Sequence, residues 1–362
     1  MFYNLLYPLS NSISLFNILK YITFRAAMAA VTTFFISLLL GKYIIESLRK
    51  FKIQENIRKE GFSQLYNVQN HKQGTPTMGG LLIVISVVFS TLLWADMLNK
   101  YIILTLSTFS SLAVLGFVDD YTKLKSLNSK GLSMFTKLVA QLAICLIIGI
   151  VLFFDNSISK DLYFPFLKNF VINLGILYIP FVLLVVCGAS NAVNFTDGLD
   201  GLAVGCTIMT ALAFSVLSYI TGHAKFSQYL FIPFIPQAGE LTVFCSALVG
   251  ACMGFLWFNC FPASIFMGDV GSLAIGGAIG MVAILIKKEF LLVIVGGIFV
   301  IEAVSVIMQI ISYRLYKKRI FKMAPLHHHF QISGMPESKI IIRFWIISAI
   351  LAILTLITLK TR

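Results

Sequence analysis

Charged side chains are scarce in this sequence, and acidic ones are the scarcest. Only 12% of its 362 residues are charged, with 15 Asp and Glu against 28 Lys and Arg, whereas soluble globular domains carry about 25%. This scarcity excludes an ordinary soluble protein, because 58% of the residues are hydrophobic and fall in long blocks rather than in helical stripes. These features predict an all-α, polytopic integral membrane protein.

Paired cysteines are also lacking. None of the six cysteines has CxxC spacing, and all lie in or beside apolar runs, which indicates free, buried thiols. No soluble module presents basic and aromatic residues together, so a nucleic-acid partner is not expected. The chain does not start with the basic segment of a signal peptide, and we interpret residues 1–20 as an interfacial amphipathic lead-in.

The apolar blocks predict about ten transmembrane helices in a single domain that covers residues 1–362. No soluble module or obvious repeat interrupts the series. A spanning helix needs about 20 apolar residues, so the fifth and eighth blocks are short. The predicted spans are 24–45, 78–97, 101–118, 135–154, 172–187, 202–219, 241–258, 271–286, 290–312 and 341–359.

The distribution of basic residues predicts the orientation. Ten spans place both termini on one side of the membrane. The loops after the odd-numbered spans, with their span edges, hold 17 Lys and Arg, against 10 in the opposite loops and termini. By the positive-inside rule the first set is cytoplasmic and both termini are external. The excess positive charge also suits anionic lipids and phosphate-bearing substrates.

The polar clusters of the chain all fall in the predicted cytoplasmic set. Five loops could therefore contribute to one site on the cytoplasmic face. The clusters are Lys72 with Thr75–Gly80, Asp119 with Asp120, Asn191–Gly201, Asn259 with Phe266–Gly271, and His327–His329.

Acidic residues in these clusters predict a metal site. Asp119 and Asp120 end a predicted helix, where the dipole disfavours acids, so either a cation compensates them or they form a solvated helix end. Asp269 lies between glycines, which lets it reach a ligand or simply form a Gly-rich turn. Carboxylates, an Asn and phosphate oxygens are ligands for Mg²⁺. Zn²⁺ fits less well, because no Cys or His pair has helical ligand spacing.

The remaining clusters favour phosphate binding. Asn191–Gly201 is a turn-forming interruption with two Asp-Gly pairs, although a plain connecting loop has the same composition. His327–His329 follow Pro325, so we expect them to begin in a non-helical loop, where one or two could contact phosphate or merely form a polar loop. Lys72, Lys123 and Lys125 could clamp phosphates or anchor the chain at the membrane surface.

Two further residues have both a functional and a structural interpretation. Phe266 could stack on a base or pack in the core. Glu302 lies within the ninth predicted span, where an acid is a functional candidate, but it could pair with Gln309 or another helix. Together the residues indicate a membrane-embedded, Mg²⁺-dependent enzyme that acts on phosphates, with a lipid as one possible substrate. A ten-span secondary transporter is the alternative, although transporters place their ligands near the midplane.

Five motifs together resemble the polyprenyl-phosphate N-acetylhexosamine-1-phosphate transferase superfamily. They are Thr75-Pro-Thr-Met-Gly-Gly80, Asp119-Asp120, Asn191-Ala-Val-Asn-Phe-Thr-Asp-Gly-Leu-Asp-Gly201, Phe266-Met-Gly-Asp-Val-Gly-Ser272 and Ala324-Pro-Leu-His-His-His-Phe330. The triple His, with Pro336-Glu-Ser-Lys339 and Arg343-Phe-Trp345, resembles the phospho-N-acetylmuramoyl-pentapeptide transferases. A sister N-acetylglucosamine-1-phosphate transferase is the nearest alternative. The resemblance extends from about residue 70 to the C-terminus.

This resemblance implies a reaction and a location. UDP-N-acetylmuramoyl-pentapeptide and undecaprenyl phosphate would give lipid I and UMP with Mg²⁺, in a multi-pass protein of the bacterial cytoplasmic (inner) membrane. A homodimer is the family expectation. The ninth span of the family is broken and forms a groove for the long lipid.

The resemblance also implies roles for individual residues. The implied catalytic group is Asp119, Asp120, Asp269 and His328, and the implied metal ligands are Asp269, Asp119 and Asn194. The implied substrate-binding residues are Lys72, Thr77, Asn194, Phe195, Asp197, Gly198, Asp200, Asn259, Phe266, His327, His329 and Gln309. The sequence departs from the family at Phe195, where Leu is more usual, and at Cys260-Phe261, which replaces a more polar pair.

Overall fold

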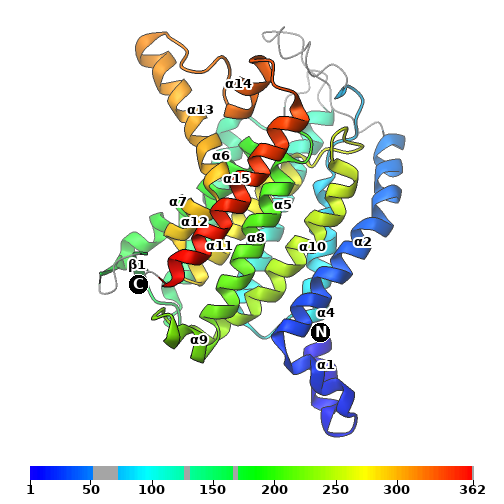
Figure 1. The fold of residues 1–362 in the computed structure, drawn as a ribbon, viewed down its shortest axis with the longest axis vertical. Helices are drawn as coiled ribbons and strands as arrows, with labels where there is room; N and C mark the ends of the chain where they lie inside the picture. The colour runs from blue at the N-terminus through cyan, green and yellow to red at the C-terminus, as the bar shows by residue number, and fades with distance from the viewer. Residues whose placement is uncertain (52–71, 126–130, 166–169, 361–362) are drawn as a thin grey trace.

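The computed structural model describes residues 1–51, 72–125, 131–165 and 170–360, and its helices run mostly along one axis (Figure 1). The long helices are α2 (Ile22–Lys50), α4 (Gly80–Trp94), α5 (Lys100–Lys125), α6 (Met134–Phe154), α7 (Tyr178–Thr196), α8 (Leu202–Thr221), α10 (Leu241–Asn259), α11 (Gly268–Leu285), α13 (Gly297–Tyr316) and α15 (Glu337–Ile357). The short helices are α1 (Phe2–Leu6), η1 (Tyr7–Asn11), η2 (Ser14–Lys20), η4 (Gly175–Leu177), α9 (Ala224–Tyr229), η5 (Pro236–Glu240), α12 (Glu289–Val295), α14 (Leu326–Ile332) and η6 (Thr358–Lys360). Strands β1 (Asp161–Tyr163) and β2 (Val171–Asn173) pair antiparallel.

The predicted all-α, polytopic architecture is confirmed. Within the described residues, nine helices are long and apolar enough to cross a membrane, and the shorter α4 makes a tenth. The ninth predicted span, 290–312, is divided at Gly296 into α12 and α13. Both termini lie at one end of the bundle and α14 lies at the other (Figure 1), as an even number of crossings requires.

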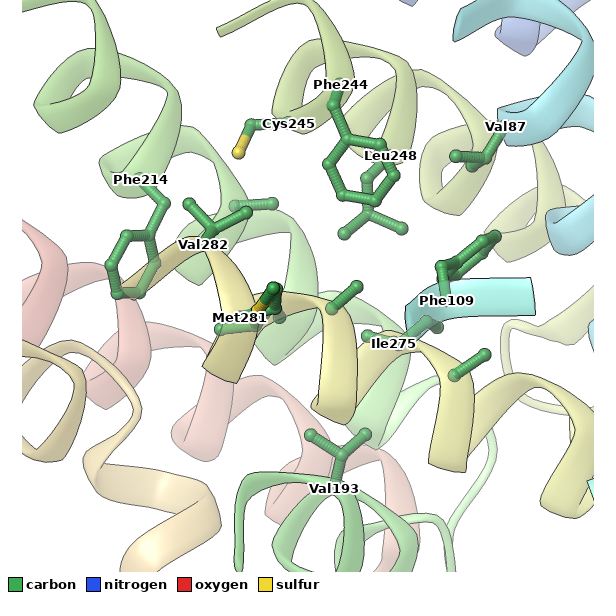
Figure 2. Close-up of a cluster of buried hydrophobic side chains, with 14 of the residues drawn as sticks. Val87, Phe109, Val193, Phe214, Phe244, Cys245, Leu248, Ile275, Met281 and Val282 are labelled. Carbon is green, nitrogen blue, oxygen red and sulfur yellow. The ribbon is translucent and has the colours of Figure 1, made fainter. Parts of the chain in front are cut away.

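Helix α11 is the centre of the bundle. Within an 18-residue apolar window of each helix, 94% of the residues are buried in α11, against 22% in α13 and 28% in each of α2, α6 and α15. Figure 2 shows its Ile275 and Met281 among aromatic side chains such as Phe109 and Phe214. A Cβ at Gly276 would overlap the backbone of α7, so small residues let these two helices approach closely.

Two predicted helix ends and one predicted loop were wrong, and in each case the structure has helix where the sequence predicted none. Helix α5 continues to Lys125 rather than ending at 118, and α7 continues through Asn191 to Thr196 rather than ending at 187. The three histidines lie in α14, not in a non-helical loop. The apolar pattern ends where polar residues begin, but the helices continue because those polar side chains find buried partners. The thiols are free as predicted, although Cys260 is exposed.

A buried ion pair joins distant segments near the termini. Arg25 in α2 donates two hydrogen bonds to Glu240, at 2.7 and 2.6 Å. Glu240 Oε2 also accepts from the backbone N–H of Asp96 at 3.0 Å, and Arg25 lies 4.2 Å from the centre of the Tyr3 ring. The pair therefore connects the N-terminal segment, α2, the α4–α5 turn and the start of α10.

Replacing Glu240 with Gln should destabilise the fold, because Arg25 would stay buried without its counter-charge. Removal of one partner of a buried pair costs about 3–5 kcal/mol, which should appear as a lower thermal unfolding midpoint in detergent. Lys100→Gln is the control, since Lys100 pairs with Asp155 through a side chain that is 55% exposed and such pairs contribute at most about 1 kcal/mol. Equal unfolding midpoints for the two variants would contradict the expectation.

Candidate active site

Three aspartates from two helices meet at one point. Asp119 and Asp120 lie near the end of α5, and Asp269 lies in the first turn of α11. One oxygen of each carboxylate lies within 4.8 Å of the others, and no residue of the three is more than 9% exposed. We call these residues the acid cluster. Like charges this close are strongly unfavourable in a poorly hydrated place unless cations compensate them.

Two lysines supply that compensation. Lys123 Nζ lies 2.9 Å from Asp119, 3.1 Å from Asp120 and 2.5 Å from Asp269. Lys137 Nζ lies 3.3 Å from Asp119 and 2.7 Å from Asp269. With all five groups ionised, the acid cluster keeps one uncompensated negative charge and therefore still attracts a cation.

The backbone around the acid cluster fixes the directions of the carboxylates. Gly268 has a φ of +73°, and a Cβ there would lie 2.6 Å from Asp120 Oδ2, so the position favours glycine. The Val270 N–H donates to Asp120 at 3.2 Å, and the Leu132 N–H donates to Asp119 at 2.8 Å. Asp269 also benefits from the dipole at the start of α11.

Helix α7 contributes Asn194 to the same point. Its Nδ2 donates to Asp269 Oδ1 at 2.5 Å and to Ser272 Oγ at 2.8 Å. Because α7 extends beyond its predicted end, the polar stretch that begins at Asn191 is presented from a helix. Asn194 is thereby held more firmly than it would be in a loop.

The donor set of the acid cluster fits a divalent cation. Mg²⁺ binds oxygen ligands at about 2.0–2.1 Å in octahedral geometry, so its ligand atoms lie at most about 4 Å apart. The carboxylate oxygens of the acid cluster lie within 4.8 Å of one another, so a small adjustment would bring them to one ion. Asp119 and Asp269 offer such oxygens. Asn194 also carries a carboxamide oxygen, although in this structure its Nδ2 is the group that contacts Asp269. The acid cluster contains no Cys or His, which makes it a poor site for Zn²⁺.

A second group of buried charges joins three more segments. Lys72 Nζ donates to Asp200 at 2.6 Å and to Glu337 at 2.5 Å. The Asp200 N–H donates to Glu337 at 3.1 Å, and Asp200 accepts from the Ala263 N–H at 2.9 Å. We call Lys72, Asp200 and Glu337 the loop network. It holds the segment before α4, the α7–α8 turn and the start of α15 together.

Phe266 lies between the acid cluster and the loop network. Its backbone N–H donates to Pro76 and its carbonyl accepts from Gly79, each at 2.8 Å, so two of the predicted motifs pair through their backbones. The Phe266 ring is half-buried, and Lys72 Nζ lies 5.9 Å from its centre. Thr77, in the segment that carries Pro76 and Gly79, lies beside Gly268.

Asn259 fixes the neighbouring turn. Its Oδ1 accepts from the Gly201 N–H at 3.0 Å, and its Nδ2 donates to the Ile265 carbonyl at 2.7 Å. Asn259 is 3% exposed. Its hydrogen bonds therefore hold the end of the Asn191–Gly201 stretch against the segment that carries Phe266.

Glu302 holds the first histidine of α14. Its carboxylate accepts from the His327 backbone N–H at 3.2 Å and contacts His327 Nδ1 at 3.1 Å, and both residues are fully buried. This contact directs His327 Nε2 toward Gly198, where a Cβ would overlap the ring. Of the two alternatives for Glu302, the structure therefore shows a partner on another helix rather than Gln309.

The three histidines have different partners. Burial lowers the pKa of both His327 and His328 to about 3, so both are neutral near pH 7. His328 Nδ1 lies 3.1 Å from Gln331 Oε1, which leaves its other nitrogen as an acceptor. His329 Nδ1 accepts from the Lys322 N–H at 3.1 Å and holds the loop before α14.

The structure brings most of the predicted site residues together. Asp119, Asp120, Asn194 and Asp269 meet directly. Phe195 and Asp197 follow Asn194 at the end of α7. Hydrogen bonds or close approaches link a further set of predicted residues to the segments that carry these four: Lys72, Thr77, Gly198, Asp200, Asn259, Phe266, His327 and His328. The ring of His329 contacts the loop before α14 instead. Gln309 accepts from the backbone N–H groups of Ile320 and Phe321, in the loop after α13. Substrate contact by any of these residues stays a prediction. The side chain of Lys125 lies outside the described residues.

Two residues of this site were not singled out from the sequence. Lys137 was counted only as a cation at the membrane edge, and Glu337 only as part of a motif. Lys137 could have been found from the sequence, because closely placed carboxylates require cationic partners and Lys137 lies at the edge of the next predicted span. The Ser133 hydroxyl caps the start of α6 by accepting from the Thr136 N–H at 3.0 Å, which places Lys137 in the first turn of that helix.

Comparison with known proteins agrees with these motifs. Residues 101–287 match the family described as glycosyl transferase family 4. Residues 72–84 match phospho-N-acetylmuramoyl-pentapeptide-transferase signature 1.

Similar chains extend over the full length. Proteins of Citrifermentans bemidjiense, Geobacter sp. strain M21 and Nitratidesulfovibrio vulgaris are 52%, 51% and 50% identical to this chain, with 100% of both chains covered in each case. Each is named phospho-N-acetylmuramoyl-pentapeptide-transferase. By this identity over its full length, the chain belongs to the phospho-N-acetylmuramoyl-pentapeptide-transferase family.

Proposed function

We propose that this chain transfers phospho-N-acetylmuramoyl-pentapeptide from UDP-N-acetylmuramoyl-pentapeptide to undecaprenyl phosphate, which forms lipid I and releases UMP. The observation that carries the proposal is the convergence of Asp119, Asp120 and Asp269 with Lys123 and Lys137, in a chain of this family. Five charged groups that share one point suit a reaction in which phosphate groups are exchanged.

The proposed chemistry is a displacement at phosphorus. An oxygen of the lipid phosphate attacks the β-phosphorus of the sugar nucleotide, and the bond to UMP breaks. Both reactants are anions, so the barrier is mainly electrostatic and positional. Mg²⁺ held by Asp269, Asp119 and Asn194 would neutralise charge on the diphosphate and make UMP a better leaving group.

The chain's own residues would do the rest. Lys123 and Lys137 would donate to phosphate oxygens. Asp119 would orient or deprotonate the lipid phosphate, with Asp120 beside it. We favour this direct route, since it needs only a base, whereas a two-step route needs a carboxylate nucleophile and a phospho-enzyme.

The nucleotide-sugar site would extend from the acid cluster to the loop network. Phe266 would stack on uracil, because its half-buried ring lies between the two groups. An ammonium group has three donors, so Lys72 can keep its two carboxylates and still donate to a phosphate. The neutral His328 would contact phosphate or sugar, and Asn194, Asp197 and Asp200 would line the same turn.

We further propose that the protein lies in the bacterial cytoplasmic membrane, with the acid cluster on the cytoplasmic face and both termini outside. The excess of basic residues in the loops at that end supports this orientation. A homodimer is our expectation for its assembly.

A UMP-release assay tests the function. Purified protein is given undecaprenyl phosphate, Mg²⁺ and UDP-N-acetylmuramoyl-pentapeptide, with UDP-N-acetylglucosamine as the competing donor. We expect UMP only with the muramoyl donor. Release with the N-acetylglucosamine donor alone would indicate the sister activity, and transport of a solute without UMP release would indicate a transporter.

Asp269→Asn and Asp119→Asn should each lower turnover by at least about 10². Each substitution removes a carboxylate that would hold Mg²⁺, and Asp119 would also orient or deprotonate the lipid phosphate. Turnover is measured by UMP release at saturating substrates. Asp161→Asn is the matched control, since Asp161 lies in the hairpin β1–β2 and outside the acid cluster. Near-normal turnover in folded Asp269→Asn protein would remove its assignment.

Removal of Mg²⁺ should abolish UMP release and also lower thermal stability. A ligand that binds only the folded state stabilises it by about 2.7 kcal/mol at 100 times its Kd. We therefore expect Mg²⁺ to raise the unfolding midpoint of the wild type but not that of Asp269→Asn. Equal stabilisation of both proteins would place the ion elsewhere.

Acidification should destabilise the protein through its buried histidines. Between the ordinary pKa of about 6.5 and the folded pKa of about 3, only the unfolded state binds their protons. The stability contributed by neutral His327 and His328 is thus complete above pH 6.5 and decreases below it, by at most about 1.4 kcal/mol per pH unit for each histidine. His328→Gln should make the unfolding midpoint less sensitive to pH between 7 and 5, and an unchanged slope would refute this.

A further inference from the structure

A row of side-chain contacts links Lys72 of the loop network to His328. Lys72 Nζ donates to Glu337 Oε1 at 2.5 Å, and Gln331 Nε2 donates to Glu337 Oε2 at 3.3 Å. Gln331 Oε1 in turn lies 3.1 Å from His328 Nδ1. Lys72, Gln331 and Glu337 are only 7%, 5% and 9% exposed, so water competes little for these contacts.

The donors and acceptors in this row fit together in one way. Both oxygens of the Glu337 carboxylate can only accept, and Oε1 already accepts from Lys72 and from the Asp200 N–H. Gln331 therefore turns its amide NH₂ group toward Oε2, because the opposite orientation would set its carbonyl oxygen against a carboxylate. The carbonyl oxygen of Gln331 then faces His328 Nδ1. Since a carbonyl can only accept, the hydrogen of this contact lies on Nδ1.

The other ring nitrogen of His328 is thereby left with a lone pair. Burial lowers the pKa of His328 to about 3, so the ring is neutral near pH 7 and carries only one hydrogen. Among the described residues, no group bonds His328 Nε2, and unlike Nε2 of His327 it is not enclosed by the protein. His328 Nε2 can therefore accept a hydrogen bond from a ligand but cannot donate one.

We propose that Gln331 and Glu337 are positioning residues that hold the hydrogen of His328 on Nδ1, so that Nε2 accepts from a hydroxyl or N–H group of the bound sugar nucleotide. An ionised phosphate oxygen can only accept, so it does not suit this nitrogen. The inference rests on the proposed function for the identity of the ligand. It assigns His328 to the hydroxyl and amide groups of the sugar nucleotide rather than to its phosphates.

Nitrogen NMR of protein isotopically labelled at its histidine nitrogens tests the tautomer, because protonated and unprotonated imidazole nitrogens give separate signals. The signals of His328 are those that disappear in His328→Gln. We expect a hydrogen on Nδ1 and none on Nε2 in substrate-free wild type. A hydrogen on Nε2 instead would overturn the proposal, and this arm does not depend on the folding of a Gln331 variant.

Two variants of Gln331 test the positioning role. Gln331→Met offers Nδ1 no strong acceptor, so both tautomers should appear, whereas the carboxylate of Gln331→Glu should keep the hydrogen on Nδ1. One neutral hydrogen bond corresponds to about fivefold in affinity. Gln331→Met should therefore raise the KM for the sugar nucleotide about fivefold and leave the KM for undecaprenyl phosphate unchanged. Wild-type tautomer and KM in folded Gln331→Met would overturn the proposal.

A control and a substrate arm complete the test. Gln228→Met should behave as wild type, because Gln228 is exposed on α9, at the other end of the bundle from α14 (Figure 1). UDP-N-acetylmuramoyl-pentapeptide added without lipid should shift the His328 Nε2 signal and leave this nitrogen unprotonated, and a proton on Nε2 in that complex would refute the assignment. Failure of the proposed function would appear differently, as absence of UMP release by a wild type that has the expected tautomer.

Discussion

Mutual repulsion of buried carboxylates is the constraint on which the rest of this structure depends. Asp119, Asp120 and Asp269 would separate if the backbone allowed it, since each is shielded from water. Their positions are kept by the backbone donors of Val270 and Leu132 and by ammonium groups from α5 and α6. A site built this way favours any ligand that brings positive charge between the carboxylates or negative charge onto the lysines. Phosphate transfer with a divalent ion does both.

That arrangement needs a rigid centre, and α11 provides it. Asp269 projects from the first turn of the most buried helix in the bundle. Glycines along α11 allow α7 to pack at short range, which brings Asn194 to Asp269. The outer helices expose much more of their surface, as lipid contact requires. The buried helix α11 thus holds Asp269 rigidly at the centre, while outer helices such as α13 form the exposed surface of the bundle.

The sequence was sufficient for the parts of the fold that depend on composition. Long apolar blocks predicted the helices, and acids at their ends predicted the acid cluster, since both are costly unless they have partners. Helix ends were not predictable from hydropathy: α7 runs on to Thr196 because Asn194 finds Asp269 and Ser272. The roles of Lys137 and Glu337 depend on contacts across more than 130 residues. No local pattern carries that information.

Glu302 shows how the broken ninth span can be connected to the chemistry. Helix α13 exposes Ile301 and Ile307 to the surroundings of the bundle, at 47% and 53%, while its one acid points inward to His327. That histidine packs on Gly198, in the turn that also carries Asp200 of the loop network. A lipid that displaced α13 would move His327 and therefore the turn beside Phe266. Because Glu302 and His327 are both fully buried, a shift of α13 cannot be absorbed by solvent and would be passed to the turn that carries Gly198 and Asp200.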